Sequence, residues 1–135
     1  MKTLVILAHP NLSNSHVNKT FMEVLGKDDE FVIHNLYELY PDFEIDVLQE
    51  QELLLAHNTI VLQFPLYWYN MPPLLKKWFD DVFVQGFAYG TNGNKLAKKQ
   101  LFISISTGGA SESYTDFGYN KFTLTELLRP LEATA

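Results

Sequence analysis

The sequence predicts an α/β fold in which an open parallel sheet carries helices on both faces. Short apolar runs at residues 3–8, 31–36, 59–64 and 100–106 alternate with segments whose apolar residues recur at helical spacing. This alternation is typical of βαβ units, because parallel strands are joined by crossover connections. The chain has 135 residues and is 47% hydrophobic, so it can bury a core, and we expect residues 1–135 to form a single domain.

The first half of the chain supplies two strands, each followed by a helix. The first strand leads through a polar loop into a helix expected over residues 15–26. A strand at 31–36, an aromatic-rich loop at 36–43 and a helix over 46–57 follow. The helix over 15–26 would end at Gly26 and bury one apolar face, made up of Val17, Phe21, Val24 and Leu25.

The second half repeats the pattern. The strand at 59–64 is continuously apolar, as expected for a strand buried on both faces. A helix begins at Pro72 and Pro73, since proline is tolerated in a first helical turn. The loop at 84–99 is long enough to suggest a functional or interface role, and a last helix is expected over 119–128.

Unusual segments follow the first, third and fourth strands, at the edge of the sheet where ligands bind in open α/β folds. The first is rich in Ser, Asn and His and enters a helix, whose free N–H groups suit a phosphate. The second presents aromatic rings, and the third has two glycines that allow close approach to a flat ligand. Taken singly, each segment has a simpler explanation as a strand or helix cap, a packed aromatic cluster or a turn. Together they indicate a flavin nucleotide.

Several other functions are disfavoured. The net charge of −6 offers no basic stripe for nucleic acid. No cysteine is present, no Gly-x-Gly-x-x-Gly or Walker loop follows the first strand, and there is no Gly-x-Ser-x-Gly. His9, His16, His34 and His57 lack the spacing of metal ligands, so we expect no metal site and interpret His34 and His57 as structural or solvated.

Short motifs in order along nearly the whole chain carry a family resemblance. They are Ala8-His9-Pro10, Ser15-His16-Val17-Asn18-Lys19, Leu36-Tyr37 with Tyr40-Pro41-Asp42-Phe43, Pro65-Leu66-Tyr67-Trp68-Tyr69, Pro72-Pro73-Leu74-Leu75-Lys76, Phe87-Ala88-Tyr89-Gly90 and Thr107-Gly108-Gly109. With these motifs the chain resembles the flavodoxin-like NAD(P)H:quinone oxidoreductases. Within them it is most similar to the bacterial ancillary proteins of glutathione-gated potassium-efflux systems and the general stress NAD(P)H oxidoreductases.

The resemblance implies a bound FMN or FAD that passes hydride from NAD(P)H to a quinone. It places the flavin phosphate at His9 and at Ser15, His16, Val17 and Asn18. It places the isoalloxazine against Pro65, Leu66, Tyr67, Trp68 and Tyr69, and its polar edge against Thr107, Gly108, Gly109 and Ala110. Tyr114 is the expected catalytic residue, although Asn120 stands where relatives with that tyrosine carry a histidine.

The resemblance also implies a homodimer, with Tyr67–Tyr69 and Phe87–Tyr89 as candidate interface segments. A quinone is the expected acceptor and the cytoplasm the expected location. The alternative function is a regulatory ancillary subunit that docks on a potassium-efflux transporter at the inner face of the membrane. Relatives continue into a fifth strand and a final helix, so we expect a flavodoxin-like sheet of order 2-1-3-4 with the fifth strand missing, as in a chain truncated at its C-terminus.

Overall fold

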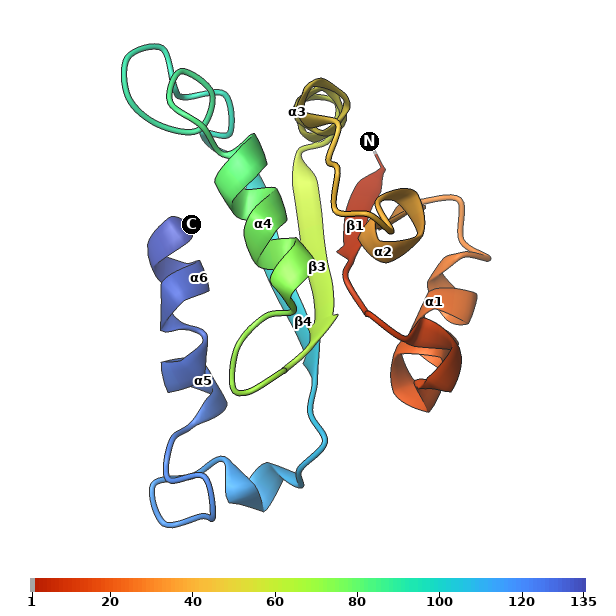
Figure 1. Cartoon of the computed structure of the whole chain (residues 1–135), viewed down its shortest axis with the longest axis vertical. Coiled ribbons are helices and arrows are strands. Elements are labelled where there is room, and N and C mark those ends of the chain that lie inside the picture. The colour runs from red at the N-terminus through yellow and green to blue at the C-terminus, as the bar shows by residue number, and fades with distance from the viewer. Residues whose placement is uncertain (1) are drawn as a thin grey trace.

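The computed structural model describes residues 2–135 and contains one four-stranded sheet (Figure 1). Its strands are β1 (Thr3–Leu7), β2 (Phe31–Asn35), β3 (Thr59–Pro65) and β4 (Gln100–Ser106). All neighbouring strands pair in parallel, in the order β2-β1-β3-β4. The expected fold class and strand order are therefore confirmed.

Helices connect and cover the strands. They are α1 (His16–Leu25), α2 (Leu36–Leu39), α3 (Val47–Leu55), α4 (Pro73–Val82), α5 (Leu124–Leu127) and α6 (Arg129–Thr134). Single 3₁₀ turns, η1 (Leu12–Asn14) and η2 (Ser111–Ser113), lie in the loops after β1 and β4. None of the helices described between residues 2 and 135 is long and apolar enough to cross a membrane.

Two predictions of local structure were wrong. The segment expected as a loop at 36–43 begins with the short helix α2. The helix expected over 119–128 does not form, because Lys121 has a left-handed φ of 62° and the helical turn starts only at Leu124. Thr123 and Glu126 fix that start as a reciprocal capping box, in which each side chain accepts a hydrogen bond from the other residue's backbone N–H.

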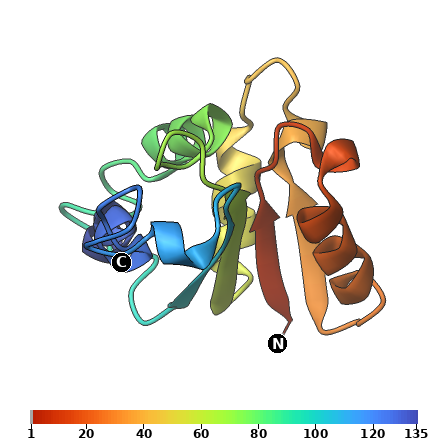
Figure 2. The same cartoon turned by 90° about the horizontal axis from the view of Figure 1, so that it is seen from below.

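The main core lies between the sheet and the helices α3 and α4. Leu4 and Ile6 of β1 point into it and share this core with Trp78 of α4, and all three are buried. Val5 and Leu7 point to the opposite face, where Met22 of α1 covers them. Figure 2 shows α1 beside the β1 and β2 half of the sheet, while α5 and α6 lie at the far side next to α4. Helices thus pack on both faces of the sheet, because alternate side chains of β1 are buried on opposite faces.

Most of the apolar face predicted for α1 is turned to solvent, and only Leu25 of that face packs, half-buried, against Val5, Leu7 and Met22. Val17 and Val24 are 69% and 62% exposed, and Phe21 is also exposed, whereas the buried residues of the helix are Asn18 and Met22. These two residues are four apart and therefore share one face. The helix takes this orientation because the side chain of Asn18 is hydrogen-bonded to Gln63 of β3 and Ser106 of β4.

A buried carboxylate links four elements of the main core. Glu50 of α3 is fully buried and accepts hydrogen bonds from the Tyr40 hydroxyl (2.5 Å) and the Trp78 indole N–H (2.8 Å). His34 Nε2 of β2 lies 2.7 and 3.0 Å from its two oxygens. Burial alone would raise the pKa of Glu50, but these hydrogen bonds outweigh burial and hold the pKa below its usual value. His34 is therefore structural, and so is the buried His57, whose Nδ1 lies 2.8 Å from the Leu53 carbonyl.

Candidate functional site

The loops that follow β1, β3 and β4 meet at the carboxyl edge of the sheet. There they enclose a cleft of about 540 Å³, whose wall includes the start of α1. A second cleft of about 330 Å³ adjoins it, because Leu66 and Gly108 line both. The larger cleft is lined by His9, Ser15, His16, Val17, Asn18, Pro65, Leu66, Tyr67, Thr107 and Gly108, and the smaller by Leu66, Trp68, Tyr69, Gly108, Gly109 and Tyr114. Of the predicted site residues only Ala110 lines neither.

The start of α1 presents free backbone donors to the larger cleft. Ser15 is the N-cap, and its hydroxyl oxygen accepts a hydrogen bond from the Asn18 backbone N–H. Between residues 2 and 135 the backbone N–H groups of His16 and Val17 have no acceptor. Together with the positive end of the helix dipole, these groups suit a phosphate or another anion.

Asn18 anchors this helix start to the sheet. Its side-chain amide donates to the Ser15 hydroxyl (2.9 Å) and the Ser106 hydroxyl (2.8 Å), and its oxygen accepts from Gln63 Nε2 (2.5 Å). The residue is buried, and these bonds use both hydrogens of its side-chain amide. Asn18 therefore positions the loop and has no free side-chain donor for a ligand.

Gln63 and Ser106 are site residues that the sequence analysis missed. Both are polar residues within or at the end of otherwise apolar strand runs, and this break in the apolar pattern could have marked them as site residues. Gln63 is buried in β3, and its Oε1 has no hydrogen-bond partner among the described residues. A buried amide in a central strand is costly, so a role in fixing the cleft explains its presence.

His9 enters the larger cleft as a neutral donor. Its Nδ1 accepts a hydrogen bond from the Asn11 backbone N–H at 3.0 Å, so the ring proton resides on Nε2. Burial lowers the pKa of His9 below its usual value. The ring also meets Tyr67 edge to face, with 6.5 Å between the ring centroids. At neutral pH the Nε2–H group is thus available to a ligand oxygen.

The aromatic segment after β3 forms a tight turn. Tyr67 and Asn70 exchange backbone hydrogen bonds of 2.8 and 3.1 Å. Between them Trp68 and Tyr69 have φ values of 48° and 64°, in the left-handed region. Each such residue costs about 1–2 kcal/mol relative to ordinary backbone geometry. Trp68 is nevertheless 91% exposed, and strain combined with an exposed aromatic side chain is typical of a functional turn.

The glycine segment after β4 offers an open cradle. A Cβ added to Gly108 would meet no atom within 4 Å, so the backbone here borders empty space shared by both clefts. The backbone N–H groups of Thr107, Gly108 and Gly109 have no acceptor in the described chain. The ring of Tyr114 lies 3.5 Å from where a Gly109 Cβ would stand. Free N–H groups beside open space can donate to the oxygens of a ligand, and the donors at α1 can donate to an anion.

Comparisons with known proteins identify the family of the chain. A family model described as the flavodoxin-like fold matches residues 1–135. The uncharacterized NAD(P)H oxidoreductase YrkL of Bacillus subtilis (strain 168) is 52% identical over the whole chain, which spans 78% of the length of YrkL. The potassium-efflux ancillary protein KefG of Cronobacter sakazakii is 44% identical over 99% of the chain and 73% of its own length.

Solved structures show the same fold. General stress protein 14 of Treponema denticola, crystallised with FMN, is 44% identical with a TM-score of 0.95, covering 99% of this chain and 78% of that one. An NADPH-quinone reductase from P. pentosaceus is 40% identical with a TM-score of 0.91, covering 100% of this chain and 77% of that one. The sequence match over the full length and these structural matches show that the chain belongs to the family of the flavodoxin-like fold.

Proposed function

We propose that this protein is an FMN-dependent NAD(P)H:quinone oxidoreductase. The observation that carries the proposal is the pair of adjoining clefts, one with free N–H groups at a helix start and the other bordered by aromatic rings and a glycine cradle. A phosphate and a flat ring system joined by a short chain would fill both. The names of the relatives, an NAD(P)H oxidoreductase, an NADPH-quinone reductase and a protein crystallised with FMN, support the same activity.

In this proposal the larger cleft holds the phosphate. His9 Nε2–H and the backbone N–H groups of His16 and Val17 would donate to it, while Ser15 and Asn18 keep the helix start in place. No lysine or arginine lines this cleft, so the phosphate would rely on hydrogen bonds and the helix dipole.

The smaller cleft would hold the reactive ring. Pro65, Leu66 and the turn from Tyr67 to Tyr69 would form one wall. The N–H groups from Thr107 to Gly109 would face the ring's oxygens, and Ala110 follows directly after them. When bound, the flavin supplies hydride transfer between NAD(P)H and an acceptor. The chain would bind and orient the flavin and exclude water from it. The Tyr114 hydroxyl, beside Gly109, is the candidate group to exchange a proton.

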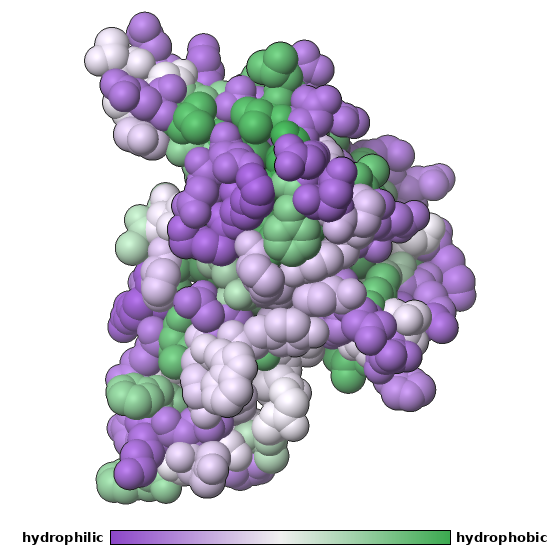
Figure 3. Space-filling view, viewed as in Figure 1, coloured by the Kyte–Doolittle hydropathy of each residue, from purple (hydrophilic) through white to green (hydrophobic). Residues whose placement is uncertain are grey.

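The aromatic side chains exposed at the smaller cleft suit a hydrophobic quinone or a second protein surface. Trp68 and Tyr119 line this cleft and are 91% and 90% exposed, and Phe117, two positions before Tyr119, is fully exposed. Figure 3 shows some apolar residues on the surface at the lower end of the molecule, where the segment after β4 lies. We propose a homodimer that covers part of this surface, in a cytoplasmic protein. Identity to KefG favours one alternative, docking on a potassium-efflux protein, and the two roles are compatible.

The activity is tested by loading the purified protein with FMN and following NADH and NADPH oxidation with menadione as the quinone probe. We expect oxidation that needs both FMN and the quinone. A Gly108→Leu variant should lose it, because the new side chain would occupy space shared by both clefts. No quinone-dependent oxidation by FMN-loaded protein would refute the proposed activity and leave the ancillary-subunit alternative.

A further inference from the structure

The segment from residue 107 to residue 122, which follows β4, is closed mainly on itself. The Asn120 N–H donates to the Ser113 carbonyl at 2.9 Å, and the Gly118 N–H donates to the Thr115 carbonyl at 3.1 Å. Gly118 is required at its position, since a Cβ there would lie 2.3 Å from the Glu112 carbonyl oxygen. These contacts give the segment a defined shape.

Little attaches this segment to the rest of the molecule. None of its residues belongs to either apolar core cluster. Among the hydrogen bonds between residues 2 and 135, a single one joins it to another part of the chain: the Tyr69 hydroxyl donates to Asn120 Oδ1 at 3.0 Å. The position of the segment therefore depends strongly on this bond.

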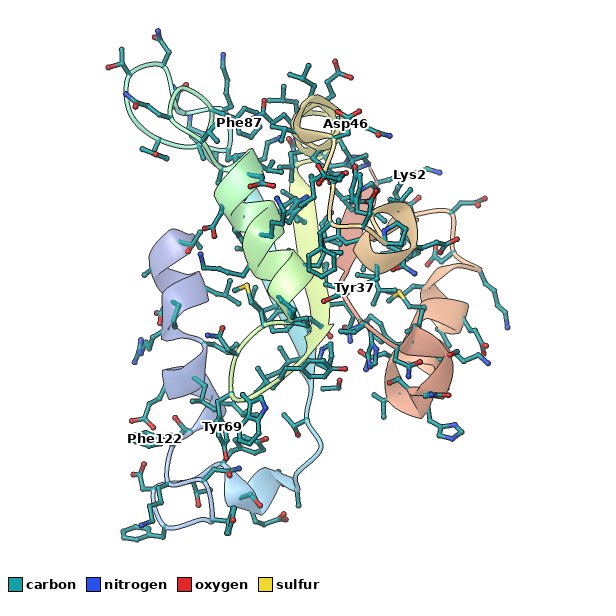
Figure 4. The ribbon with its side chains drawn as sticks, in the orientation of Figure 1. Lys2, Tyr37, Asp46, Tyr69, Phe87 and Phe122 are labelled. Atoms are coloured by element: carbon teal, nitrogen blue, oxygen red, sulfur yellow. The ribbon has the colours of Figure 1, made fainter. Side chains whose placement is uncertain are left out.

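The bond crosses the rim of the smaller cleft. Tyr69 belongs to the strained turn, Asn120 to the segment, and both line the cleft together with Tyr114. Figure 4 shows Tyr69 at the lower end of the molecule, next to the segment that follows β4. An asparagine amide does not titrate, so Asn120 can hold the Tyr69 hydroxyl but cannot relay a proton.

We propose that Asn120 is a positioning residue that acts through Tyr69. The Tyr69–Asn120 bond keeps the segment, with Tyr114, closed against the aromatic turn, and so shapes the cleft where the substrates would meet the flavin. This inference rests on the proposed function for its effect on turnover, but its structural part concerns the protein without cofactor.

The structural part is tested by hydrogen exchange of residues 107–122 in the cofactor-free protein. Tyr69→Phe and Asn120→Ala should each speed exchange by about 2- to 10-fold, the worth of one neutral hydrogen bond. The double variant should exchange no faster than the faster single variant, because both changes remove the same bond. Asn120→Asp, which keeps an acceptor oxygen, should restore protection.

Tyr119→Phe is the matched control, since it removes a hydroxyl that has no hydrogen bond within the described residues. It should leave exchange of the segment unchanged. Unchanged exchange in both Tyr69→Phe and Asn120→Ala, or additive effects in the double variant, would overturn the inference.

Turnover separates a positioning role from a purely structural one. In FMN-loaded protein, Asn120→Ala should raise KM for NAD(P)H and quinone by about 2- to 10-fold with a smaller change in kcat, and Asn120→Asp should rescue KM. Faster exchange with unchanged KM would contradict the positioning role. If wild-type protein reduces no quinone while the exchange results hold, the proposed function fails and the structural part of the inference stands.

Discussion

Replacing Asn18 with Asp tests phosphate recognition without removing the contacts that hold the helix start. Gln63 Nε2 can still donate to a side-chain oxygen at this position. The hydroxyls of Ser15 and Ser106, which accept from the asparagine, can rotate and donate to a carboxylate instead. The fold should therefore persist, while a negative charge appears beneath the start of α1.

That charge should repel a phosphate held by the N–H groups of His16 and Val17. Two unit charges about 6 Å apart interact by roughly 3 kcal/mol at an effective dielectric constant of about 20. Allowing for screening by salt, we expect FMN affinity to fall by about 10- to 100-fold. Riboflavin has the same ring and no phosphate, so its affinity should fall by less than about 3-fold.

The assay is fluorescence titration of FMN and of riboflavin, after urea unfolding has established that Asn18→Asp is folded. Asn58→Asp is the matched control, because it adds the same charge at an exposed position before β3, at the opposite edge of the sheet. It should bind both ligands like the wild type. Equal losses for FMN and riboflavin, or an unchanged FMN affinity, would refute phosphate binding at this helix start.

Other predictions concern stability and pH. Glu50→Leu should lower the free energy of unfolding by about 3–6 kcal/mol in urea denaturation, since it strands buried donors such as the Tyr40 hydroxyl and the Trp78 N–H; a loss below about 1 kcal/mol would contradict this. Trp68→Gly should raise the urea midpoint by relieving the left-handed φ of 48°, yet weaken flavin binding. For His9, burial lowers the folded-state pKa below 6.5, so its contribution to stability is complete above pH 6.5 and declines as the pH falls through the folded-state pKa. The urea midpoint should thus drop less between pH 7 and pH 5 in His9→Gln than in the wild type, and an equal drop would count against the neutral histidine.

Much of the fold followed from the sequence because its signals are local. The apolar runs predicted the strands of the sheet to within about a residue, and the prolines before Leu74 marked the start of α4. The loops around His9, Tyr67 and Gly108 could be grouped in advance, since carboxyl ends of parallel strands share one edge. The structure brings these loops together around the adjoining clefts.

What could not be predicted depends on contacts between residues distant in sequence. Helical spacing cannot show that Asn18 faces the sheet and Val17 the solvent, because that choice rests on Gln63 and Ser106. The same holds for Asn120, whose contact with Tyr69 spans 51 positions. Polar residues paired across the fold leave no periodic signal.

The most direct test of the account is the visible absorbance of the purified protein after incubation with FMN and desalting. We predict retained bands near roughly 370 and 450 nm, with about one FMN per chain. Gly108→Leu, treated in the same way, should emerge colourless but folded. A wild-type protein that is folded and yet retains no FMN would contradict the claim that the adjoining clefts form a flavin site.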